Sequence, residues 1–206
     1  MWWPAPNDDK ALGVVRTAMN RHNAEMARLR YSAITSADGY VNDENGSFDW
    51  AVPSDELHAV VNDHQREIGT LLLGRRMYEV MRYWDDDAPD WGPDERAFAE
   101  AWRQQPKWVV SRGSPPLGPN ASQVGADLEA AVTEIKSRVS GEIEVAGPEL
   151  AHQLGALGLI DEYRIYLHPV ALGSGRPYFA GARPPLRLVS ANRLDGDVMR
   201  LVYVPD

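Results

Sequence analysis

Three short segments of this chain of 206 residues carry residue types that bind anions, and each follows a predicted β-strand. Gly74-Arg75-Arg76 begins a predicted helix, so backbone N–H groups, the helix dipole and two guanidinium groups can meet on one phosphate. Ser111-Arg112 follows a second strand, and Ala146-Gly147-Pro148 follows a third with small residues that let a diphosphate approach the backbone. An arginine there can also be a solvated surface residue, and a glycine can simply end a strand. Three such segments together favour an anionic nucleotide or dinucleotide.

Two carboxylates border the loop 38–53, where acid–base chemistry could take place. Asp38 lies in the turn Ala37-Asp38-Gly39, and Asp55 lies in the first turn of a helix predicted to begin at the N-cap Ser54. Each has an alternative structural explanation. Asp38 is typical of an Asx-type turn, and Asp55 suits the positive end of the helix dipole.

Several other chemistries are excluded or disfavoured. The chain has no cysteine, which excludes disulfides, thiolate zinc sites and a cysteine nucleophile. The five histidines have no metal-ligand spacing, so we expect no metal site, and we expect His168 to take part in packing or hydrogen bonding. No G-x-G-x-x-G lies between a strand and a helix, and neither a Walker A motif nor a serine nucleophile motif is present. A standard Rossmann domain is therefore disfavoured.

The elements that must position these residues alternate between strand and helix as far as residue 161. The predicted strands cover 28–35, 70–73, 107–110 and 142–146, and the predicted helices cover 54–67, 75–83, 94–104, 127–139 and 148–156. Beyond this point we expect a strand at 161–170, a tight loop at 173–177 and a hairpin of 186–193 with 198–204. This order predicts an α/β fold of three layers, with helices on both faces of a mixed, mostly parallel sheet and an antiparallel C-terminal edge.

Length and composition predict one domain, 28–206, after an N-terminal extension, 1–27. Apolar spacing in the extension favours an amphipathic helix, and an unstructured leader is the alternative. The net charge of −9 disfavours nucleic acid as a partner. No apolar run approaches the roughly 20 residues that span a bilayer. The first residues lack the pattern of a secretory signal, so a cytoplasmic location is expected.

Several segments match a known family in their order and spacing: Ser32–Val41, Leu71–Glu79, Val109–Arg112, Val145–Leu150, and most specifically Leu159–Tyr163 leading to His168–Phe179. From about Leu29 to its C-terminus the chain resembles the dihydrofolate reductase-like superfamily. Within it, the chain is most similar to the stand-alone relatives of the reductase domain of bacterial riboflavin biosynthesis.

The resemblance implies an NADPH-dependent reductase that transfers a hydride to a C=N or C=O bond of a small heterocyclic substrate. The substrate would be pterin-like or pyrimidine-like, as for dihydrofolate reductase and the 5-amino-6-(5-phosphoribosylamino)uracil reductase of riboflavin biosynthesis. The resemblance also implies the cofactor contacts: Ala33 and Ile34 at the nicotinamide, Gly74, Arg75 and Arg76 at phosphates, Ser111 and Arg112 at the 2′-phosphate end, and Ala146, Gly147, Pro148, Glu149 and Leu150 at the diphosphate. Because the family often dimerises, a homodimer is expected, with the C-terminal strands and the N-terminal extension as its contact surface.

For the substrate, the segment from Trp50 to Asp55 resembles the Trp-x-x-Pro-x-acid stretch of dihydrofolate reductases, in which the acid binds the pterin ring and assists its protonation. Asp55 is therefore the first candidate catalytic residue, and Asp38 is the second. Trp50 and Thr35 are the candidate substrate-binding residues. A carboxylate that is half-buried beside an aromatic wall can accept N–H bonds and hold a raised pKa.

The chain departs from the family pattern at one motif. Riboflavin-pathway reductases usually show Glu-Gly-Gly-Pro, whereas this chain has Val145-Ala146-Gly147-Pro148. The zinc deaminase half that often precedes such a reductase is also absent, as the lack of cysteine requires. Both departures weaken the case for the riboflavin-pathway substrate but not the case for NADPH. The alternative function is a non-catalytic nucleotide-binding or scaffold protein on the same fold.

Overall fold

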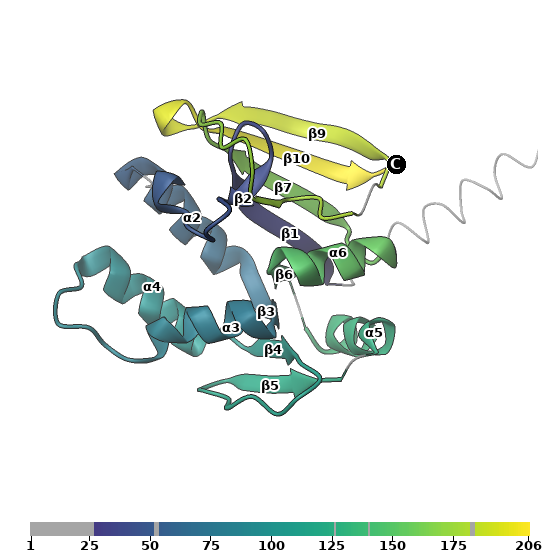
Figure 1. Cartoon of the computed structure of the whole chain (residues 1–206). Coiled ribbons are helices and arrows are strands. Elements are labelled where there is room, and N and C mark those ends of the chain that lie inside the picture. The colour runs from purple at the N-terminus through teal and green to yellow at the C-terminus, as the bar shows by residue number, and fades with distance from the viewer. Residues whose placement is uncertain (1–26, 52–53, 126, 140, 182–183) are drawn as a thin grey trace, which may run out of the picture.

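The computed structural model describes residues 27–51, 54–125, 127–139, 141–181 and 184–206. Its centre is an eight-stranded sheet in the order β5-β4-β3-β6-β1-β7-β10-β9 (Figure 1). The strands are β1 (Arg28–Thr35), β3 (Ile68–Gly74), β4 (Lys107–Val110), β5 (Ala121–Val124), β6 (Glu142–Ala146), β7 (Glu162–Leu167), β9 (Leu186–Arg193) and β10 (Met199–Pro205). Neighbours from β5 to β7 are parallel, whereas β10 is antiparallel to both β7 and β9.

Helices cover both faces of this sheet (Figure 1). The α-helices are α2 (Asp55–Glu67), α3 (Arg75–Met81), α4 (Pro93–Gln104), α5 (Leu128–Arg138) and α6 (Pro148–Ala156). On one face, α5 and α6 bury Val132, Ile135 and Leu154 against Leu29, Tyr31 and other core residues. On the other face, α3 and α4 contribute Tyr78 and Trp102 to a cluster with Leu71 and Leu73 of β3. The predicted three-layer α/β/α fold with an antiparallel C-terminal edge is confirmed.

Residue types that cap or begin helices, and one apolar run, explain where several of these elements lie. Asp127 caps α5, because its carboxylate accepts a hydrogen bond from the Ala130 N–H at 3.1 Å. Pro93 and Pro148 occupy first-turn positions of α4 and α6, where a missing N–H costs nothing. The middle of β3, Leu71–Leu73, is buried on both faces, as its continuous apolar run predicts.

Four features differ from the sequence expectation. The sequence pattern does not predict β5, because Ser122 and Gln123 are polar and exposed. A separate ribbon pairs β2 (Tyr40–Asn42) with β8 (Arg176–Pro177), inside segments expected to be loops. The strand expected at 161–170 is shorter and covers only Glu162–Leu167. Beyond it, the His168 N–H donates to the Thr35 carbonyl and the Val170 carbonyl accepts from the Ala37 N–H, both in the segment that ends β1 and begins the next loop. The helix expected at 75–83 ends at Met81, where the short 3-10 helix η2 (Arg82–Asp85) begins.

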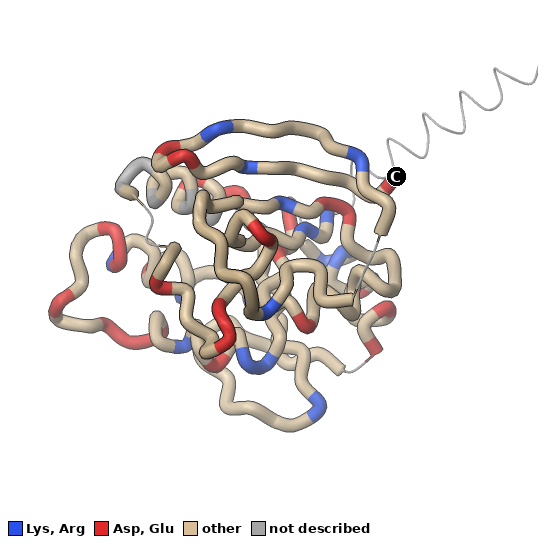
Figure 2. Tube along the Cα trace, turned by 45° about the horizontal axis from the view of Figure 1, so that its top comes forward, with Lys and Arg blue, Asp and Glu red and all other residues tan. Residues whose placement is uncertain are grey.

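The acidic run between α3 and α4 lies along an outer loop (Figure 2). Among the described residues, no helix is long and apolar enough to cross a membrane. The predicted N-terminal extension lies outside the described residues except for Ala27.

Ionisable side chains, buried or half-buried, lie between the centre of the sheet and α2, in an arrangement that we call the ion cluster: Arg30, His64, Glu142, Glu144, Glu162 and Arg164. Arg30 of β1 is only 1% exposed. Its Nε donates to Glu144 Oε2 at 2.8 Å, and its Nη1 donates to Glu142. His64 of α2 lies between Arg30 and Arg164, with ring nitrogens 2.9 and 2.8 Å from their guanidinium groups. The cluster therefore joins α2 to β1, β6 and β7.

Candidate active site

The three predicted anion-binding segments lie at one edge of the sheet. β4, β3, β6 and β1 are consecutive neighbours, and they run parallel. Gly74 is in register with Val110, and Leu73 is in register with Ala146. The carboxyl ends of these strands consequently meet at the same edge, which is where open α/β sheets bind ligands. We call this the carboxyl edge.

The starts of α3 and α6 lie close together at this edge, next to Gly74 and Gly147. A Cβ added to Gly74 would lie 3.6 Å from Leu150 Cβ, and one added to Gly147 would lie 3.5 Å from Met77 Cβ. Gly147 also has φ +108°, a conformation that side chains rarely adopt. The Leu150 side chain is 3% exposed and lies in the core, so only its backbone faces the edge.

The arginines that the sequence assigns to phosphate differ in their contacts. Arg75 Nε donates to Glu79 Oε1 at 2.8 Å, one turn further along α3. Arg76 Nη1 donates to Glu149 Oε1 at 3.4 Å, and Arg176 of β8 donates to the same oxygen at 2.5 Å. A carboxylate repels phosphate, so the Glu149 side chain is unsuited to the diphosphate role that the resemblance implies, and its backbone N–H is the group that suits it.

The turn after β4 is fixed by a neighbouring strand. Ser111 is buried, and its Oγ accepts from the Gly113 N–H at 3.2 Å. Gln123 of β5 donates to the carbonyl oxygens of Ser111 and Gly113 at 3.0 and 2.6 Å. Arg112 is exposed and makes no hydrogen bond or ion pair with any residue that the structure describes. Its guanidinium group is thus available to an anion.

The carboxylate of Asp38 is occupied by the protein itself. It accepts from Ser36 Oγ at 2.6 Å, from the Gly173 N–H at 2.7 Å and from the Leu172 N–H at 3.1 Å. The bond from Ser36 and the two backbone bonds lower the pKa of Asp38 to about 2. A group that stays ionised at neutral pH cannot donate a proton, so the geometry favours the turn role over the catalytic one.

The predicted substrate residues lie where β1 and β7 end. Thr35 is the last residue of β1, and Trp50 lies in the short 3-10 helix η1 (Asp49–Ala51). His168 directly follows β7, its N–H donates to the Thr35 carbonyl at 2.8 Å, and its ring meets that of Trp50 edge-on with centroids 6.0 Å apart. Thr35 Oγ1, Trp50 Nε1 and His168 Nε2 are buried without a hydrogen-bond partner among the described residues. Burial lowers the pKa of His168, which favours its neutral form.

The remaining predicted residues are placed less directly. Ala33 and Ile34 are successive residues of β1, so their side chains point to opposite faces of the sheet, and they pack with separate core clusters. Both can border one ligand only through their backbone. Asp55 begins α2, and Ser54 Oγ accepts from the Leu57 N–H at 3.3 Å as an N-cap. The Asp55 side chain lies outside what the structure describes.

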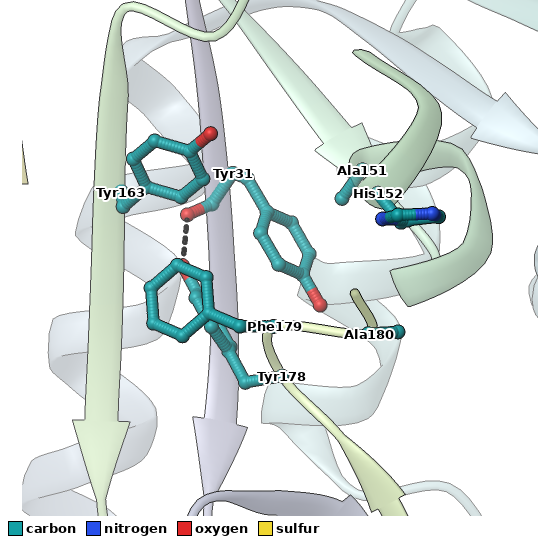
Figure 3. A pocket seen from close by; sticks show the side chains of 7 residues that line it. All are labelled: Tyr31, Ala151, His152, Tyr163, Tyr178, Phe179 and Ala180. Carbon is teal, nitrogen blue, oxygen red and sulfur yellow. Dashed lines mark hydrogen bonds between the residues drawn. The ribbon is translucent and has the colours of Figure 1, made fainter. Parts of the chain in front are cut away.

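A pocket is lined by aromatic side chains of β1, β7 and the segment after β8, together with Ala151 and His152 of α6 (Figure 3). Tyr31 and Tyr178 stack with centroids 4.5 Å apart, and Tyr178 Oη donates to the Tyr31 carbonyl at 2.8 Å. These contacts hold the chain that follows β8 against β1. The side chains around this pocket therefore pack against one another and anchor β8 to the sheet.

Sequence reasoning misses three residues at this edge. It assigns His168 to packing or hydrogen bonding, which agrees with its contacts but does not mark it as a candidate site residue, and it does not predict the strand that carries Gln123. Arg176 enters the sequence reasoning only as part of the segment that resembles the family. The available signal was its position directly after the glycine-containing loop Gly173-Ser174-Gly175.

The fold and the order of these segments define a protein class, the dihydrofolate reductase-like α/β/α proteins. Dihydrofolate reductase from Enterococcus faecalis, solved with NADP(H), matches with a TM-score of 0.57 at 12% identity, over 88% of this chain and 99% of that chain. The Thermotoga maritima diaminohydroxyphosphoribosylaminopyrimidine deaminase/5-amino-6-(5-phosphoribosylamino)uracil reductase matches with a TM-score of 0.66 at 13% identity, over 90% of this chain and 58% of that chain.

The family follows from the sequence itself. Residues 27–199 match the RibD C-terminal domain family, and the chain belongs to that family. The uncharacterized protein YyaP of Bacillus subtilis is 26% identical over 188 residues, which cover 88% of this chain and 97% of YyaP. The resemblance stated from the motifs is confirmed at the level of family and fold.

Proposed function

We propose that this protein is an NADPH-dependent reductase that acts on a small pterin-like or pyrimidine-like heterocycle. The observation that carries the proposal is the contiguous carboxyl edge from β4 to β1, which spans three strand spacings, or roughly 14 Å. That is the length scale of an extended dinucleotide. Family membership supports a reductase-type activity.

The residues at this edge fit an anionic dinucleotide. Gly147 adopts φ +108°, which favours glycine and leaves its backbone without a side chain, and Arg112 supplies an unpaired guanidinium group among the described residues. Arg112 would hold the 2′-phosphate, because guanidinium groups bind phosphate through paired hydrogen bonds. The bound cofactor would supply the hydride. The protein would orient the heterocycle near Trp50, where buried donor and acceptor atoms have no partner among the described residues.

Calorimetric titration with NADPH and NADH tests the cofactor. We expect NADPH to bind more tightly than NADH, and Arg112→Ala to weaken NADPH binding about 10-fold, since a hydrogen bond to a charged group is lost. NADH binding should barely change. Arg138→Ala, which removes an exposed arginine of α5, is the matched control. Absence of NADPH binding, or equal affinity for both cofactors, would refute the proposal.

Asp55 is our proposed proton-donating residue, because it begins α2 next to the η1 segment that holds Trp50. Asp55→Asn should lower turnover of pterin or aminopyrimidine substrates and leave NADPH affinity intact. Stopped-flow consumption of NADPH measures the first effect, and calorimetry measures the second. Unchanged turnover across pH would remove Asp55 from the mechanism. NADPH binding without turnover of any such substrate would favour the non-catalytic alternative.

We also propose a homodimer in which the C-terminal strands form the contact. Every residue of β9 is exposed or half-buried, and Leu188 and Val189 are both exposed there. Light scattering should give twice the mass of the chain, and a monomer would contradict the proposal.

A further inference from the structure

The loop that carries Arg176, residues 170–178, is held at the carboxyl edge by hydrogen bonds to residues 36–44. β8 pairs with β2, and the Tyr178 N–H donates to the Gly39 carbonyl at 2.9 Å. The Asp38 carboxylate binds two backbone N–H groups of the same loop, at Leu172 and Gly173. Gly175 adopts φ +145°, and a Cβ there would overlap the Asn42 carbonyl oxygen. The backbone that carries Arg176 is therefore fixed against residues 38–44.

One carboxylate oxygen connects this loop to two helices. Glu149 Oε1, in the first turn of α6, accepts from Arg176 Nη1 and from Arg76 Nη1 of α3. Two guanidinium groups from distant parts of the sequence thus point at one anionic oxygen. We call Arg76, Glu149 and Arg176 the clasp.

The ion pairs of the clasp can separate with little loss of stability. The Arg76 side chain is 79% exposed, that of Glu149 is 59% exposed and that of Arg176 is 39% exposed. Exposed ion pairs contribute little to stability, since water and salt screen them. A phosphate oxygen presents the same acceptor geometry to guanidinium groups as a carboxylate oxygen and carries comparable charge. A phosphate group can accordingly replace Glu149 between the two arginines without disturbing the fold.

We propose that Arg176 acts with Arg76 as a phosphate-binding pair, and that the Glu149 carboxylate occupies their binding position until a diphosphate displaces it. The inference rests on the proposed function, because the diphosphate is that of the dinucleotide. It adds Arg176 to the binding residues and gives Glu149 the opposite role, that of an internal competitor that lowers affinity.

Calorimetric titration of the full chain with NADPH, and with inorganic pyrophosphate as a competing probe, tests this pair. Arg176→Ala should weaken NADPH binding about 5-fold to 10-fold, which is below the full value of a charged hydrogen bond because the site is partly exposed. Glu149→Gln should tighten NADPH binding about 3-fold, and pyrophosphate should compete more strongly against that variant. In the Arg176→Ala background, Glu149→Gln should tighten NADPH binding by a smaller factor than in the wild-type protein, because the Glu149 carboxylate has already lost one of its two arginine partners.

The ion pair of Glu134 with Arg138 on α5 provides matched controls, since both side chains are similarly exposed. Glu134→Gln and Arg138→Ala should leave NADPH affinity unchanged, which separates a local effect from one of net charge. If the wild-type protein binds NADPH and Arg176→Ala binds it equally well, or if Glu149→Gln weakens binding, the inference is wrong and the proposed function stands. If the wild-type protein binds no NADPH, both fall.

Discussion

At the scale of single residues, the two candidate catalytic aspartates occupy different positions in the fold. Asp38 is surrounded by donors of its own chain and holds a lowered pKa. Asp55 is the first residue of α2, and along the chain it follows the η1 segment, in which Trp50 Nε1 is buried without a partner among the described residues. The donors around Asp38 stabilise its charged form, which suits a structural anchor. A proton donor needs the opposite environment.

The pKa of Asp38 makes a prediction about stability. Its carboxylate stabilises the fold above its ordinary pKa of about 4, and this contribution is lost as the pH falls through about 2, because the folded-state pKa is the lower one. Asp38→Asn should lower the thermal unfolding midpoint at neutral pH and remove part of the pH dependence between about 4 and 2. Calorimetric scans across that range measure both. An unchanged midpoint combined with lost turnover would instead make Asp38 catalytic.

At the scale of elements, the ribbon of β2 and β8 connects two loops that flank the carboxyl edge. The ribbon is short, and its close approach depends on Gly175, whose backbone lies against Asn42. No other residue type fits this position, because a side chain would collide with the Asn42 carbonyl and its φ is unfavourable for L-residues. The position of Arg176 consequently depends on one glycine.

Gly175→Ala should destabilise the protein by about 2–3 kcal/mol, as expected for steric overlap combined with an unfavourable φ. Denaturant unfolding measures the loss. Gly113→Ala is the matched control, because an added Cβ there meets nothing within 4 Å. Its effect should stay within about 0.5 kcal/mol. Equal stability of the two variants would show that the loop rearranges freely.

The sequence predicts these elements unevenly, for physical reasons. Strands such as Glu142–Ala146 have the predicted bounds, because alternating polar and apolar residue types and a following glycine mark them clearly in the sequence. β5 and β8 are short and mostly lack buried apolar residues, so no periodicity distinguishes them from loops. Local pattern alone is enough to locate the segments that follow β3, β4 and β6. The contacts of Asp38 and Arg176 join residues far apart in the chain, which no local pattern encodes.

At the scale of the whole molecule, the ion cluster ties α2 to the middle of the sheet. Arg30 and Glu144 are almost fully buried, and Ser32 donates both its N–H and its hydroxyl to Glu144. Such buried pairs add little net stability over apolar residues, but removing one partner leaves a buried charge uncompensated. α2 also begins at Asp55, so the cluster helps to hold the proposed proton donor in place.

Glu144→Gln should therefore lower the free energy of unfolding by about 3–5 kcal/mol, because Arg30 would remain charged and buried. Chemical denaturation measures the change. Glu134→Gln, which breaks an exposed pair on α5, should cost less than about 0.5 kcal/mol. A small effect of Glu144→Gln would mean that Glu142 and water compensate for the lost charge.

The fastening of residues 36–44 to residues 170–178 has a consequence for the order of folding. Asp38 bonds to residues that lie 134 and 135 positions later, and the Tyr31 carbonyl bonds to a side chain 147 positions later. Closing such long loops costs entropy that only a nearly complete sheet can offset. During synthesis, β3 and β4 can pair while the ribosome is still extending the chain. The carboxyl edge acquires its final shape only after Tyr178 has emerged from the ribosome. The chain can therefore bind a ligand at this edge only late in its synthesis or after it.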